Sequence, residues 1–328
     1  MLKEILESLG MLGNAIILLV AMLILDKSSD LTIDNAVKVA EITGLGKTTI
    51  GFLLVAFSTT LPELSVSIFS AMDPETIGVA IGNVLGSNIV NICLILGICF
   101  LILTLKGQNK THNFSNMAME EIRNLYFGLF IASLVPLTLI YIGYASSAIG
   151  AILITIFILH NIQMLKSRKS GEVYHLNKKS KTARHIAFVL LGAAGVISSA
   201  YFIVESASYI AFEMGIPKIL IGATIVAFGT SLPELVNSIN ATRKNHIELA
   251  LGNVVGSGFI NTTLILGVAL IGGQFRVNMS SYSHLVMFSI MANLLLWYFL
   301  SSERISWREG LILLFMYALF VTTSLGAY

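Results

Sequence analysis

One octapeptide occurs twice in this chain, and each copy places a proline and a carboxylate inside a long apolar run. The copies are Ala-Phe-Ser-Thr-Thr-Leu-Pro-Glu at residues 56–63 and Ala-Phe-Gly-Thr-Ser-Leu-Pro-Glu at residues 227–234. A proline in a helix interior removes a backbone hydrogen bond and costs about 3 kcal/mol. A carboxylate at membrane depth costs at least about 2.5–3.5 kcal/mol. Two matching violations of both rules indicate a functional core.

Composition predicts a multi-pass membrane protein. Of the 328 residues, 55% are hydrophobic and 12% charged, with a mean hydropathy of +0.84, against a usual charged share of about 25%. The net charge is only +2, and no basic cluster interleaved with aromatic residues occurs. We therefore expect the lipid bilayer, and no nucleic acid, as a partner. Cys93 and Cys99 lie in one apolar segment and are interpreted as packing residues.

The apolar runs predict ten membrane helices, since about 20 apolar residues cross a bilayer. The first run lacks a small-residue cleavage pattern, so it is read as a retained span and not as a signal peptide. The mixed stretch 31–46 is expected to continue the second helix or to lie at the interface. The predicted spans are residues 9–25, 48–72, 77–104, 124–143, 145–165, 185–206, 217–241, 247–271, 281–301 and 307–327.

The basic residues orient these spans. With the N-terminus outside, the loops after the odd-numbered spans are cytoplasmic, and they hold all of the 20 Lys and Arg except Lys3, Lys218 and Arg276. Basic residues concentrate on the cytoplasmic side of membranes, so both termini are predicted to lie outside. The longest strongly polar link, 166–184, becomes a basic cytoplasmic loop between a first half, 1–165, and a second half, 185–328.

The two halves repeat each other. Glu63 and Glu234 are 171 residues apart, and a second shared motif, Gly-Asn-Val-x-Gly-Ser, occurs at 82–87 and 252–257, an offset of 170. The octapeptides lie on the second and seventh spans, which run in opposite directions because five crossings separate them. Inverted repeats of this kind place a substrate site near the membrane midplane. The predicted fold is an all-α membrane protein of two inverted five-helix repeats.

The prolines are expected to open the helices that carry the glutamates. Each proline has no N–H for the carbonyl four residues earlier. Backbone oxygens over residues 56–59 and 227–230 are therefore expected to be freed. Carbonyls exposed at membrane depth are tolerated only where they line a cavity or find partners, so we expect these oxygens to lie beside a cation.

Further oxygen ligands lie on the helices that follow. Ser87 and Asn91 are four residues apart, and so are Ser257 and Asn261, so each pair shares a helix face. With the motif carboxylates they form a hard oxygen set, which suits Ca²⁺ or Na⁺ better than Zn²⁺ or Cu²⁺. No Lys or Arg lies at comparable depth, so the two carboxylates need cations or protons. The serines and asparagines allow a second interpretation, interhelical hydrogen bonds without ion binding.

The octapeptides, together with residues 82–91 and 252–261, resemble the two α-repeats of the Ca²⁺/cation antiporter superfamily. Within it, the chain is most similar to the Na⁺/Ca²⁺ exchanger branch, especially its short prokaryotic members. The resemblance implies alternating-access exchange of one Ca²⁺ against several Na⁺ in a prokaryotic cytoplasmic membrane. It also implies no permanently bound cofactor, and we expect a functional monomer whose first and sixth spans slide against the motif-bearing bundle.

Carried over by position, the resemblance implies that Glu63 and Glu234 are the central Ca²⁺ ligands. The resemblance also implies backbone oxygens of Thr59 and Thr230 at the centre, which the amides of Asn91 and Asn261 line. At the flanking Na⁺ sites it implies backbone oxygens of Ala56 and Ala227 and the hydroxyls of Thr60, Ser87, Ser231 and Ser257.

The chain departs from the family pattern at four positions, and other functions stay open. Asn261 occupies a position that is Asp in some prokaryotic exchangers, which leaves two carboxylates to neutralise one Ca²⁺. Alternatives are an H⁺/Ca²⁺ or K⁺-dependent exchanger, or a cation channel with the carboxylates as a selectivity ring. An enzyme is not expected, because no H-E-x-x-H, nucleophile elbow or P-loop occurs. The other departures are Ser58 for Gly, Thr60 for Ser, and Gly258 for the Asn found at Asn88.

Overall fold

The computed structural model describes residues 6, 8–43, 60–73, 76–105, 134, 137, 147–167, 182–243, 247–272, 279–301 and 306–325. Helices make up almost all of these residues, and no strand occurs among them, so the predicted all-α class is confirmed for this part of the chain. Six of its helices are long and apolar enough to cross a membrane, or seven if the bent pair 218–230 and 232–243 is one span. The chain is therefore a multi-pass membrane protein, while ten spans and the side of the termini stay predictions.

The helices of the first half follow the predicted spans where they are described, except that the first helix extends well beyond its span. Three segments join end to end into one crossing, at residues 77–105. The fourth predicted span, except residues 134 and 137, and most of the second lie outside the described residues. In chain order the helices are α2 (Gly10–Thr43), α4 (Leu61–Ala71), α5 (Ile77–Ile89), the π-helix η1 (Val90–Leu96), α6 (Gly97–Leu105) and α8 (Ser147–Ser167).

The second half is described more completely. Its predicted spans all have helical counterparts, with boundaries that differ by a few residues except at the end of α9. They are α9 (Thr182–Glu213), α10 (Lys218–Ile221), the π-helix η2 (Gly222–Val226), α11 (Ala227–Thr230), α12 (Leu232–Arg243), α13 (Ile247–Ile260), the π-helix η3 (Asn261–Ile265), α14 (Leu266–Gly272), α15 (Met279–Ser301) and α16 (Trp307–Leu325).

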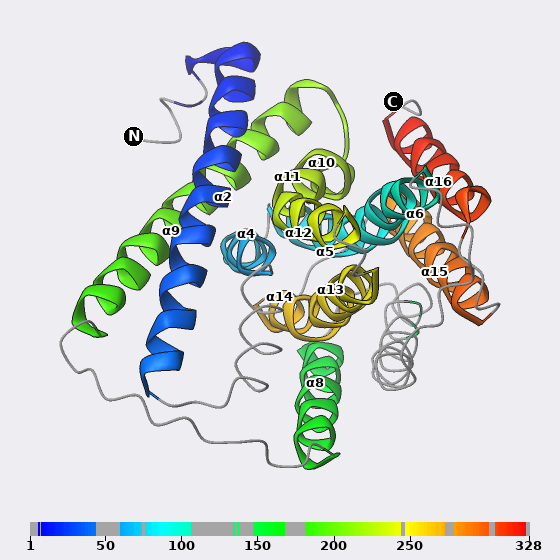
Figure 1. Cartoon of the computed structure of the whole chain (residues 1–328). Helices are drawn as coiled ribbons and strands as arrows, with labels where there is room; N and C mark the ends of the chain where they lie inside the picture. The colour runs from blue at the N-terminus through cyan, green and yellow to red at the C-terminus, as the bar shows by residue number, and fades with distance from the viewer. Residues whose placement is uncertain are drawn as a thin grey trace.

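The two longest helices, α2 and α9, lie side by side at one flank of the molecule (Figure 1). They contain 34 and 32 residues, about 50 Å at 1.5 Å per residue, which exceeds the roughly 30 Å bilayer core. Residues 31–43 therefore continue the first helix, so their expected place in the second helix is wrong, while a place at the interface stays a prediction. No proline or glycine interrupts residues 15–43, so the helix has no reason to end where its hydropathy falls.

Small residues bring α2 and α9 into backbone contact. A Cβ added at Gly192 would lie 2.3 Å from Oγ1 of Thr32, and one added at Gly195 would lie 2.4 Å from Oγ of Ser28. Beyond this contact, the ring Nδ1 of His185 on α9 lies 2.8 Å from Oδ1 of Asn35 on α2. An added Cβ at Gly192 would also lie 2.8 Å from the carbonyl oxygen of Ser28 and 2.9 Å from the backbone nitrogen of Thr32, so this glycine is needed for the close approach of the two helices.

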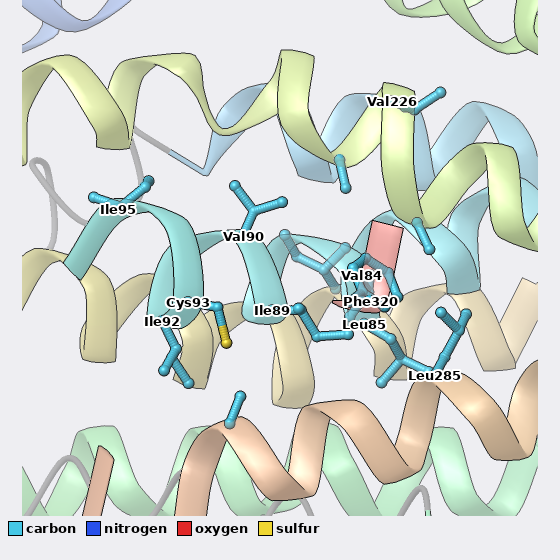
Figure 2. Close-up of a cluster of buried hydrophobic side chains, with 14 of the residues drawn as sticks. Val84, Leu85, Ile89, Val90, Ile92, Cys93, Ile95, Val226, Leu285 and Phe320 are labelled. Atoms are coloured by element: carbon cyan, nitrogen blue, oxygen red, sulfur yellow. The ribbon is translucent and has the colours of Figure 1, made fainter. Parts of the chain in front are cut away.

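The helix α5 forms the centre of the remaining bundle. Apolar side chains of α5 and η1 share one buried cluster with Val226 of η2, Leu285 of α15 and Phe320 of α16 (Figure 2). On another face, a Cβ added at Gly82 or Gly86 would lie 1.9 or 2.2 Å from the carbonyl oxygens of Ile219 and Ala223. Such close backbone approach is typical of packing between membrane helices, and it fixes the first half against the second.

Candidate cation site

The second octapeptide breaks its helix at Ser231. Helix α11 ends at Thr230, α12 begins at Leu232, and the two parts of this span are bent by 48°. Pro233 lies in the first turn of α12, where its missing N–H removes no intrahelical hydrogen bond. In the first copy Pro62 lies in the first turn of α4 in the same way. The helix opening predicted from the prolines is confirmed in the second copy.

The backbone oxygen of Ala227 differs from the prediction. It accepts a hydrogen bond from the backbone N–H of Ser231 at 3.1 Å, and Oγ1 of Thr230 lies 3.3 Å from it. The bond from Ser231 is the ordinary α-helical bond from the residue four positions later, so this carbonyl keeps its helical donor and is not freed by the break. Ala56, its counterpart in the first copy, and Thr59 lie outside the described residues.

The two glutamates of the motifs come together in the interior. Glu63 and Glu234 are both fully buried, and they are the only charged residues among the buried residues that the structure describes. Their negative charges repel each other. Burial of two like charges is costly, so the site favours any species that neutralises both.

Each carboxylate receives a hydrogen bond from a serine hydroxyl. Oγ of Ser231 donates to Oε1 of Glu63 at 3.2 Å, and Oγ of Ser257 donates to Oε1 of Glu234 at 3.1 Å. A donating hydroxyl keeps lone pairs on its oxygen. Both serines can therefore hold a carboxylate and offer an oxygen to a cation at the same time.

The asparagines of the prediction are also at the centre but differ in their partners. Nδ2 of Asn91 donates to Oγ of Ser257 at 3.3 Å, which extends the chain from Glu234 into the first half. Asn261 and Ser87 are fully buried, and within the described residues neither side chain has a hydrogen-bond partner; the same is true of Oε2 of Glu63. Buried polar atoms without partners are uncommon and mark positions where a ligand can bind.

The remaining predicted ligands that the structure describes are also in the interior. Thr60, which directly precedes α4, is 1% exposed, and Thr230 and Ala227 are fully buried. Every described member of the predicted set therefore lies at or beside the break in a motif helix, or on the helix that follows it.

Two asparagines that were not predicted as site residues hold the glutamate backbones. Nδ2 of Asn83 lies 3.4 Å from the carbonyl oxygen of Glu63 and 3.5 Å from Oγ of Ser67. In the second half, Nδ2 of Asn253 makes the same two contacts with Glu234 and Ser238, at 3.4 and 3.1 Å. Both asparagines belong to the repeated Gly-Asn-Val-x-Gly-Ser motif, so the repetition was the signal that could have found them.

Asn83 has an additional partner across the halves. Its Oδ1 accepts a hydrogen bond from Oγ1 of Thr230 at 2.9 Å. The side chain therefore ties the end of α11 to the backbone of Glu63 on α4. Through this one residue, the second motif helix is connected to the backbone of the first glutamate.

The π-helices are a second feature that the sequence analysis missed. The π-helix η1 begins one residue before Asn91, and η3 begins at Asn261 itself. A π-turn widens the helix by one residue, and such turns are frequent at functional sites. An apolar run has the same composition whether its turns are α or π, so hydropathy carries no signal for them.

The atoms gathered here are almost all oxygens, together with two asparagine amides. Among the described residues no group of three or more His, Cys, Asp and Glu is close enough to hold a metal. Two carboxylates with hydroxyl and carbonyl oxygens form the hard ligand set that Ca²⁺ and Na⁺ prefer. Such a ligand set suits a hard cation, and in the part of the chain that the structure describes the site pairs no nucleophile with a base.

Known proteins show the same architecture over nearly the whole chain. The model of the family described as sodium/calcium exchanger protein matches residues 13–164 and 184–326. The chain is 30% identical to the sodium/calcium exchanger MaX1 of Methanosarcina acetivorans, over 94% of this chain and 97% of that protein. Among solved structures it is similar to the sodium-calcium exchanger NCX_Mj, with a TM-score of 0.61, 26% identity and coverage of 95% and 99%.

The fold is also that of the H⁺/Ca²⁺ exchanger CAX, with a TM-score of 0.76 over 95% of this chain and 87% of that one, at 19% identity. At that identity the likeness concerns the fold alone. The family match, by contrast, includes both motif-bearing helix pairs. The chain therefore belongs to the sodium/calcium exchanger protein family and is a membrane antiporter, not an enzyme.

Proposed function

We propose that the chain exchanges Ca²⁺ for Na⁺ across a prokaryotic cytoplasmic membrane by alternating access. The observation that carries the proposal is the pair Glu63 and Glu234, buried in the interior and each facing a serine hydroxyl. Their two charges neutralise one Ca²⁺, and the same oxygens suit Na⁺. Because the two ions use the same carboxylates, either Ca²⁺ or several Na⁺ occupy the cavity, and one species displaces the other.

The other residues of the site fall into three proposed roles. Backbone oxygens of Thr59 and Thr230 add to the central Ca²⁺ position, and Asn91 and Asn261 line it. Flanking Na⁺ positions are formed by four hydroxyls and two carbonyls. The hydroxyls belong to Thr60 and Ser231 on the motif helices and to Ser87 and Ser257 on the helices that follow, and the carbonyls belong to Ala56 and Ala227. The burial of every described member supports this assignment.

The proposed architecture is ten spans in two inverted repeats, 1–165 and 185–328, with both termini outside and the loop 166–184 in the cytoplasm. No permanent cofactor is needed, since the transported cations supply the positive charge of the site. One chain contributes both glutamates, so the protein is proposed to work as a monomer in the bilayer. The pair α2 and α9 slides against the motif-bearing bundle to switch access.

The test is Ca²⁺ flux in vesicles that contain the purified protein, with Na⁺, K⁺ or H⁺ gradients imposed in turn. The proposal expects Ca²⁺ uptake driven by an outward Na⁺ gradient, and none in protein-free vesicles. Uptake driven by a pH gradient without Na⁺ would identify an H⁺/Ca²⁺ exchanger instead. Rapid Ca²⁺ flux that needs no counter-ion would identify a channel, and no flux under any gradient would refute the proposal.

A further inference from the structure

The two halves are joined near the site by a buried hydrogen bond between Asn88 and Thr262. Nδ2 of Asn88, two residues before η1, donates to Oγ1 of Thr262, the second residue of η3, at 2.5 Å. Each of the two side chains is 1% exposed. The hydroxyl of Thr262 in turn donates to the carbonyl oxygen of Gly258 at 2.9 Å. Thr262 is thus held on both sides, by its own helix and by the opposite half of the chain.

This bond has no counterpart on the other side of the pseudo-twofold relation. At the offset of 170 residues, Asn88 corresponds to Gly258 and Thr262 corresponds to Ile92. Neither of those side chains can form a hydrogen bond, so the contact can be made in one direction only. The asparagine clamps at Asn83 and Asn253, by comparison, occur in both halves. Two of the positions at which the repeats differ are therefore the two ends of one contact.

The contact lies beside the central residue that has no support of its own. Asn91 is positioned by its hydrogen bond to Ser257, whereas Asn261 has no side-chain hydrogen bond within the described residues. The place of the Asn261 amide therefore depends on its backbone in η3. Thr262 is the next residue along that backbone, and it is the one fixed to the first half. The halves thus support their central amides by different means.

We propose that Asn88 is a positioning residue for ion binding, which acts through Thr262 to set the place of Asn261 in the cation site. The inference rests on the proposed function, because it assigns Asn261 to that site. Residues that orient a ligand without touching the ion commonly change affinity by about 10–100-fold when they are replaced. Loss of the Asn88–Thr262 bond lets the first turn of η3 shift, and the amide then meets the cation in a poorer geometry.

The test compares four single variants for half-saturating Na⁺ and Ca²⁺, for maximal exchange rate, and for the rise in unfolding temperature that each cation produces. Thr262→Val removes the hydroxyl with little change in volume, and Asn88→Ala removes the donor. Thr262→Ser keeps the hydroxyl. Thr263→Val is the matched control, since Thr263 lies in the same π-helix and donates to its own helix at Phe259, away from Asn88.

We expect the half-saturating cation concentration to rise about tenfold in Thr262→Val and in Asn88→Ala. In Thr262→Ser and Thr263→Val it should stay near the wild-type value. A double variant that combines Asn88→Ala with Thr262→Val should be no worse than the worse of these two single variants, because both substitutions remove the same bond. Wild-type half-saturation in the first two variants would overturn the inference, as would equal effects in Thr263→Val. Either end suffices, so one misfolded variant does not end the test.

Failure of the proposed function gives a different outcome. If the wild-type protein binds Ca²⁺ or Na⁺, as a cation-dependent rise in unfolding temperature, but does not exchange them, the exchange mechanism fails and the inference is judged on that rise alone. A rise that is smaller in Thr262→Val and Asn88→Ala than in Thr263→Val supports the positioning role. An equal rise in all variants, or no rise in the wild type with any tested cation, overturns it.

Discussion

Ser231 donates its hydroxyl hydrogen to Glu63, although the two residues are 168 positions apart and belong to different halves of the chain. The carboxylate of the first octapeptide is thus completed by a side chain of the second octapeptide. Asn91 and Ser257 make a second such connection in the opposite direction. Under the proposed function, a cation bound at this point contacts both halves at once, so its affinity should depend on their relative position.

Replacing either glutamate by glutamine should abolish exchange while leaving the fold intact. Glu63→Gln and Glu234→Gln keep the shape and the capacity to accept a hydrogen bond but remove one of two buried charges. Removing one partner of a buried charge pair costs about 3–5 kcal/mol, which is a loss of more than about 100-fold in cation binding. The measurement is Na⁺-driven Ca²⁺ uptake in vesicles, at matched protein content.

The control for these variants is Glu213→Gln, which removes an exposed carboxylate at the end of α9. It should exchange at the wild-type rate. Retained Ca²⁺ exchange in either of the two site variants would remove the assignment of that glutamate to the centre.

The contact between α5 and the second half should be intolerant of one added methyl group. Gly86→Ala would place its Cβ 2.2 Å from the carbonyl oxygen of Ala223, a backbone atom that cannot move aside. Overpacking of this kind costs about 1–3 kcal/mol or more, so the unfolding temperature in detergent should fall by several degrees. Loss of close backbone approach should also lower the exchange rate.

Gly78→Ala is the matched comparison on the same helix. Its added Cβ would lie 3.4 Å from the backbone nitrogen of Ile219, an ordinary contact, and alanine is the better helix former by about 1 kcal/mol. This variant should unfold at or slightly above the wild-type temperature. If both substitutions lowered the unfolding temperature equally, the close contact at Gly86 would not be the cause.

Much of this site followed from the repeated motifs, but its pairings did not. The offset of 171 residues placed Glu63 and Glu234 in equivalent positions, and the hard oxygen set followed from their neighbours. The resemblance implies that a backbone oxygen of Thr59 joins Glu63 at the centre, whereas the described hydroxyl that donates to Glu63 comes from Ser231 in the other half. A helical wheel gives only neighbours on the same helix, and contacts between halves depend on crossing angles that no local pattern contains.

The same limit explains the misplaced stretch after the first span. Hydropathy marks where a helix leaves the apolar layer, and it falls near Leu25, but the hydrogen bonds of α2 continue to Thr43. Local breakers decide where a helix ends, and none is present there. The π-turns at Asn91 and Asn261 could not be predicted for a related reason, since a wider turn changes neither the composition nor the hydropathy of the segment.

Cross-links should separate the helices that move together from those that move apart. Gly195 of α9 lies against Ser28 of α2, and a Cβ there would be 2.9 Å from the Cβ of Ser28. A disulfide needs about 3.5–4.5 Å between these atoms, which a small displacement provides. The oxidised double variant Ser28→Cys with Gly195→Cys should still exchange Ca²⁺, because α2 and α9 are expected to slide as one unit.

A cross-link from α2 to the motif helix should instead stop transport. A Cβ at Gly229 would be 2.9 Å from Cγ of Met22, so Met22→Cys with Gly229→Cys is placed to form a disulfide across the sliding surface. Exchange should be lost on oxidation and return on reduction, and each single cysteine variant serves as the control. Full activity of the oxidised protein would contradict sliding of α2 over α11.

Asn261→Asp should strengthen Ca²⁺ binding by adding a third carboxylate to the centre. A further negative charge about 4 Å from a cation contributes on the order of 1–4 kcal/mol between the dielectric limits of water and a protein surface. Asn261 is fully buried and has no hydrogen-bond partner within the described residues, so the change breaks no described contact. Half-saturating Ca²⁺ in the exchange assay should fall by at least about fivefold.

The added charge should also raise the free energy of the site when no cation is bound. Three carboxylates without a cation repel one another more strongly than two, so the variant should retain Ca²⁺ longer and exchange more slowly at saturation. Asn240→Asp, an exposed position on α12, adds the same charge away from the site and should leave both quantities unchanged. If Asn261→Asp shows wild-type dependence on Ca²⁺ and Na⁺, Asn261 does not line the cation site, and the central position then consists of Glu63, Glu234 and their serine partners.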